Sequence, residues 1–168
     1  MATAPTGVMS LPKHGLRDML AASATFQEFV GAVDSAEASV FIKVGYASFP
    51  ADADPGPIAV VDNEDGSPDW SLLADGASNV LWPRGRLKLY LRAPDGAPGD
   101  MEESMTLFEN LIGGLQEDIA TIAGSGSYLN LHGITPNVAP QRTQPTEDNQ
   151  RDRPWWECEI GFSWGAIQ

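Results

Sequence analysis

The side chains that most often carry chemistry in proteins are sparse in this chain. His14 and His132 are its only histidines, and Cys158 is its only cysteine. One histidine falls in a predicted helix and the other at the end of a predicted strand. Because no Cys-x-x-Cys pair is present either, the spacing of a structural zinc site is missing. A single cysteine cannot form an intrachain disulfide, which fits a protein made in a reducing compartment.

Nucleophiles and ligand-binding loops are equally hard to find. Cys158 shares the apolar face of a predicted strand, so we expect it to be buried and inert. The chain has no G-x-S-x-G, and GSGS at 124–127 lacks the lysine of a phosphate loop. The acidic segments 52–56 (DADPG) and 62–66 (DNEDG) lack the ligand spacing of a calcium loop. We therefore predict a protein that is not an enzyme and that binds no metal or cofactor.

The basic residues are more informative, because four of the ten lie within nine residues of a chain whose net charge is −13. We call these four the basic stripe: Arg84, Arg86, Lys88 and Arg92. Two interpretations stay open, a solvated outer face of a sheet or a surface that meets acids on another subunit. Tyr90 lies within the stripe and is a candidate for the same interface. The other interface candidates are aromatic or basic: Trp70, Trp82, Arg142, Arg151, Arg153 and Trp155.

Composition limits the classes of partner. The excess of 23 acids over 10 bases argues against a strong nucleic-acid or anionic-membrane binder, because both need clustered Lys and Arg. No run approaches the 18 or so apolar residues that span a bilayer, and the first residues lack the apolar segment of a signal peptide. We expect a soluble protein that is intracellular when made. Its 168 residues suit one domain.

The element that must organise this domain is a predicted helix over 100–124. Its apolar residues are spaced alternately by four and three, which places them on one stripe: Met101, Met105, Phe108, Ile112, Leu115, Ile119 and Ile122. Leu107 and Leu111 are expected to widen the stripe. Asp100 and Glu103 have the spacing of a capping pair, and Gly124 supplies a stop. We interpret this segment as a core helix that covers a sheet.

Shorter helices are predicted before it. Segment 10–22 has Ser10 as a candidate N-cap, and residues 1–9 are expected to be mobile. Segment 25–30 opens on a T-x-x-E capping box from Thr25 to Glu28. We expect residues 34–38 to add one further helical turn.

Alternation of apolar and polar residues predicts strands at 40–46, 86–92, 129–131 and 155–164, and the wholly apolar run 58–61 predicts a buried strand. The secondary structure of segment 70–83 is ambiguous, but the segment is too apolar for a loop that contacts only solvent. Segment 135–154 carries four prolines and few apolar residues, so we expect a long polar loop. The prediction is a single α+β domain over 1–168. Its sheet is mainly antiparallel or mixed, and the long helix and the short N-terminal helices pack on one face.

The same segments carry a family resemblance. In chain order they are LRDMLAASATFQEFVGAVDSAEASVFI, PIAVVD, GRLKLYLRAP, FENLIGGLQEDI, YLNLHGITP and WWECEIGFSWG. Over nearly the full chain, the order and character of these elements resemble the tail terminator proteins of lambda-like bacteriophages, which have long, non-contractile tails.

The resemblance implies a structural virion protein of the phage neck, assembled in the host cytoplasm. Such proteins form a homohexameric ring that caps the tail tube, ends its polymerisation and joins the tail to the head connector. The implied partners are further copies of the chain, the tail tube protein and the head connector or stopper protein. DNA is only passing cargo, and no cofactor or catalytic residue is implied.

Alternatives remain at this point. The chain could be another head–tail joining or completion protein, or a non-phage intracellular protein-binding module. A tail tube subunit fits less well, because those chains are dominated by sheet. The segments 48–83 and 135–154 are long for a compact terminator, so we predict that both lie at ring interfaces or project toward axial neighbours.

Overall fold

The computed structural model describes residues 11–45, 58–63, 69–75, 78–94, 101–124, 130–143 and 155–165. The helices are α1 (Leu11–Ala22), α2 (Ala24–Val30), α3 (Ser35–Ala38), the short 3₁₀ helix η1 (Ser39–Phe41) and α4 (Met101–Gly124). The strands are β1 (Ile42–Val44), β2 (Ile58–Asn63), β3 (Asp69–Asp75), β4 (Ser78–Pro94), β5 (Asn130–Thr143) and β6 (Trp155–Gly165). The predicted mixture of helix and strand is confirmed. Residues 1–10 and the Asp100 cap lie outside the described residues.

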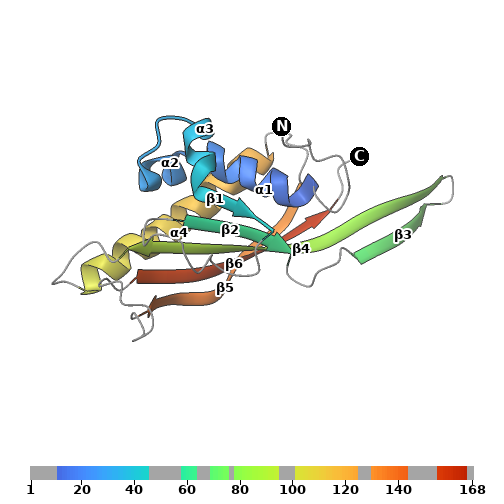
Figure 1. Cartoon of the computed structure of the whole chain (residues 1–168). Helices are drawn as coiled ribbons and strands as arrows, with labels where there is room; N and C mark the ends of the chain where they lie inside the picture. Colours follow the sequence, from blue (N-terminus) through green and yellow to red (C-terminus); the bar gives the residue numbers. More distant parts are fainter. Residues whose placement is uncertain are drawn as a thin grey trace.

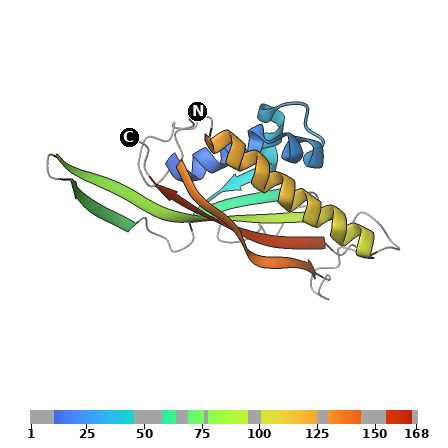
Figure 2. The ribbon, with the colours of Figure 1, turned by 180° about the vertical axis from the view of Figure 1, so that it is seen from behind.

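The strands form one mixed sheet in the order β1-β2-β4-β6-β5, with β3 paired to β4 off this path. The antiparallel expectation needs correction at one edge, where β1 and β2 run parallel. The other strand pairs are antiparallel. Figures 1 and 2 show α4 lying along one face of the sheet, with the N-terminal helices beside it on that face.

The core lies between α4 and this face of the sheet. Strand β6 contributes its alternate residues, all buried: Trp156, Cys158, Ile160, Phe162 and Trp164. The residues of β4 that lie opposite Phe162, Ile160 and Cys158 are Leu87, Leu89 and Leu91. The predicted alternation of β6 is therefore confirmed.

Helix α4 buries most of its predicted stripe. Four of its residues are buried, each worth roughly 1.5–3 kcal/mol gross: Phe108, Ile112, Leu115 and Ile119. Leu111 is buried as expected, but Leu107 is 64% exposed and Met105 is 36% exposed. Leu107 follows Glu103 by four residues, so it continues the polar face of the helix and does not widen the buried stripe.

The N-terminal helices are capped differently from the prediction. The N-cap of α2 is Ser23, whose Oγ accepts a 3.1 Å hydrogen bond from Phe26 N. The capping box predicted from Thr25 to Glu28 is therefore wrong, because the helix begins one residue earlier. The further turn predicted at 34–38 is confirmed as α3, with Asp34 as its N-cap. Helix α2 ends at Val30, and its C-cap is Gly31, whose φ of 70° suits glycine.

Strand β1 is shorter than predicted. Residues 39–41 form η1, and the strand begins only at Ile42. Val40, which lies within the predicted strand 40–46, is 66% exposed. Its β-branched side chain favours a strand locally, but the chain is still helical at this point, directly after α3.

The predicted polar loop over 135–154 is wrong for its first part, because residues 135–143 belong to β5. Its remainder, 144–154, lies outside the described residues. Strand β5 pairs only with β6 in the described sheet, and its register shifts between Pro136 and Val138 and again before Gln141. An edge strand with bulges tolerates prolines that a central strand would not.

The ambiguous segment 70–83 is resolved into a hairpin. Strand β3 pairs with residues 78–84 of β4 in antiparallel register, from Asp69 opposite Arg84 to Asp75 opposite Ser78. We call this two-stranded ribbon the arm. It projects beyond the end of the sheet (Figures 1 and 2). Strand β4 is therefore shared: its first part belongs to the arm, and its last part pairs with β2 and β6.

Candidate interaction surfaces

The basic stripe lies along β4, from the arm into the sheet. Its residues alternate with Leu87, Leu89 and Leu91, whose register positions lie opposite buried residues of β6. The stripe therefore occupies positions on the sheet face away from α4. This position fits both interpretations of the stripe, a solvated face and a subunit interface.

The strand pairing places an acidic residue opposite three members of the basic stripe. Lys88 lies opposite Asp62 of β2, and Arg92 lies opposite Glu157 of β6. At the start of the arm, Arg84 lies opposite Asp69. Opposite charges at such positions contribute roughly 0.2–1 kcal/mol per pair. Part of the stripe thus has acidic neighbours within its own subunit, which favours the local interpretation for Lys88 and Arg92.

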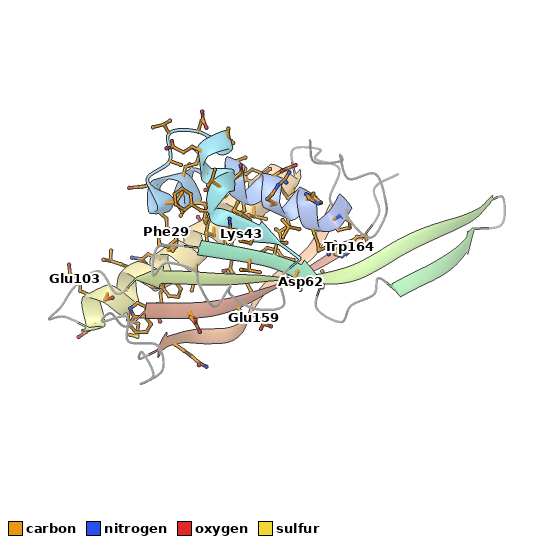
Figure 3. All side chains as sticks on the ribbon, viewed as in Figure 1. Phe29, Lys43, Asp62, Glu103, Glu159 and Trp164 are labelled. Carbon is orange, nitrogen blue, oxygen red and sulfur yellow. The ribbon has the colours of Figure 1, made fainter. Side chains whose placement is uncertain are left out.

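Three acidic residues of β2 and β6 are only partly exposed to solvent. Asp62, Glu157 and Glu159 are each half-buried, and Asp62 also lies 4.0 Å from the Lys13 ammonium of α1. Glu159 lies between the buried Cys158 and Ile160, so it falls on the sheet face away from α4, as Figure 3 shows. Arg86 differs from its neighbours in the stripe, because the residue opposite it in β6 is Ser163.

The other interface candidates fall into two groups. Trp70 and Trp82 are in the arm, at neighbouring register positions. Arg142 of β5 lies opposite Trp156, at the other end of the sheet. Trp155 begins β6 in the next row, opposite Thr143 and Pro94. The register therefore places Arg142 and Trp155 in adjacent rows, on opposite faces of the sheet, at the end away from the arm.

Arg151 and Arg153 lie outside the described residues. Sequence reasoning also missed a surface. Leu107 is 64% exposed on the polar side of α4, one turn after the exposed Glu103, whereas Met105, 36% exposed, lies on the other side of the helix. The signal that could have found it was the four-residue spacing from Glu103 to Leu107.

Two helices frame a shallow depression that holds a charged pair. It is lined by residues of α1, α3 and η1, which are Arg17, Asp18, Ala21, Ser35, Ala36 and Ser39. Arg17 Nε donates a 2.8 Å hydrogen bond to Asp18 Oδ1. This bond joins chain neighbours, so it satisfies both charges locally and leaves no reason to assign a ligand.

The potential chemical groups are isolated from one another. Burial, followed by the nearby charge of Arg17, lowers the pKa of His14, which is therefore neutral near pH 7. Burial raises the pKa of the Cys158 thiol to about 11. Among the described residues, no three His, Cys, Asp or Glu side chains could together hold a metal ion. None of the described helices is both long and apolar enough to cross a bilayer.

Comparison with known proteins adds no relative: no protein-family model matches the sequence, and no curated protein matches it.

Proposed function

We propose that this protein is a structural subunit of a bacteriophage neck, a tail terminator that assembles as a homohexameric ring. The ring caps the tail tube, ends its polymerisation and joins it to the head connector. The order and character of the sequence segments support this proposal, as does a sheet with its helices on one face (Figure 1).

The single observation that carries the proposal is the arm. An apolar two-stranded ribbon that extends beyond its own sheet suits a subunit of an assembly, because such a ribbon is marginal by itself in water. The net charge of −13 also suits a ring through which DNA passes, since like charges discourage adhesion.

The test uses the purified full chain, alone and with tail tubes of its own phage. Native mass spectrometry should give a closed oligomer, six subunits in the proposed form, and negative-stain images should show rings at tube ends. A monomer at all concentrations that ignores tubes would overturn the proposal and favour a protein-binding module. Rings that leave tube ends open would favour another head–tail completion protein.

A deletion probes the second long segment. Removing residues 144–152 leaves every described strand intact, including Gln141–Thr143 at the end of β5. We expect this variant to fold with an unchanged circular dichroism spectrum but to assemble poorly or fail to join tails. Normal rings and normal joining would show that this segment has no part in assembly.

A further inference from the structure

We draw no further inference here: the strongest candidate, the two-stranded arm that projects beyond the end of the sheet, carries none because nothing in the structure shows what covers it.

Discussion

Ser23 and Asp118 are 95 residues apart in the sequence and are joined by a 2.7 Å hydrogen bond from Ser23 Oγ to Asp118 Oδ2. The same carboxylate oxygen accepts a 3.0 Å bond from Thr25 N. Ser23 is the N-cap of α2, so Asp118 extends that cap from a different helix. A carboxylate there satisfies a backbone N–H at the helix start and complements its dipole. The two residues therefore fix α2 against α4.

Removing this carboxylate should destabilise the protein. We expect Asp118→Ala to lower the free energy of unfolding by about 1–3 kcal/mol, because Ser23 Oγ and Thr25 N lose their shared acceptor. Urea denaturation gives the value. Glu117→Ala, which changes the exposed acid next to it, should cost no more than about 0.5 kcal/mol. Equal losses in the two variants would show that the bonds contribute nothing specific.

The same carboxylate should make stability depend on pH. The backbone N–H of Thr25, followed by the Ser23 hydroxyl, lowers the pKa of Asp118. A lowered folded-state pKa contributes stability that is complete above the unfolded value of about 3.9 and is lost as the pH falls through the folded value. The stability gap between wild type and Asp118→Asn should therefore narrow below about pH 4. A gap that stays constant down to acid unfolding would contradict this assignment.

Gly113 and Gly114 form a matched pair on α4 that should respond oppositely to alanine. A Cβ at Gly114 would lie 2.9 Å from Thr25 Cγ2, whereas one at Gly113 meets nothing within 4 Å. Gly113→Ala should stabilise the protein by about 0.5–1 kcal/mol through helix propensity. Gly114→Ala should instead destabilise it by about 1–3 kcal/mol, because Thr25 must move. Thermal unfolding of both variants, and of Gly114→Ala combined with Thr25→Ala as a rescue, checks the pair.

The elements that the sequence predicts well are those whose periodicity is local. In β6, Trp156, Ile160 and Phe162 alternate with polar residues or glycine, and the face predicted to be buried is buried. Helix α4 is predicted equally well, because its apolar residues recur at alternating intervals of four and three. Both patterns follow from burying one face of a regular element, which requires no knowledge of the neighbouring element.

The elements that were predicted wrongly depend on contacts between residues that are far apart in the sequence. Whether Pro136 can lie in a strand depends on β5 being an edge, which only the finished sheet decides. The second half of the α2 cap comes from Asp118, which accepts from Thr25 N and which no window around Ser23 contains. The basic stripe was visible as composition, but its acidic neighbours, such as Glu157 opposite Arg92, appear only once the strands are in register.

The indole of Trp156 and the hydroxyl of Ser104 should be energetically coupled. Trp156 Nε1 donates a buried 2.7 Å hydrogen bond to Ser104 Oγ. The same indole stacks on Phe108 of α4, with ring centroids 6.3 Å apart. Ser104→Ala should cost about 1–3 kcal/mol of unfolding free energy, because it removes the acceptor for a buried N–H. With Trp156→Phe as the partner change, the double variant should lose less than the sum of the two single losses. Strict additivity in urea denaturation would contradict the coupling.

The thiol of Cys158 should report on the opening of the core beneath α4. It is 3% exposed, and burial, followed by the charge of Glu159, raises its pKa to about 11. At pH 8 the thiolate fraction in the folded protein is therefore about one in a thousand, and maleimide can reach it only when the core opens. We expect slow labelling of the native protein, full labelling in denaturant, and faster labelling of Asp118→Ala. The surface thiol of Leu107→Cys should react at once. Rapid labelling of folded wild type would contradict a core closed over β6.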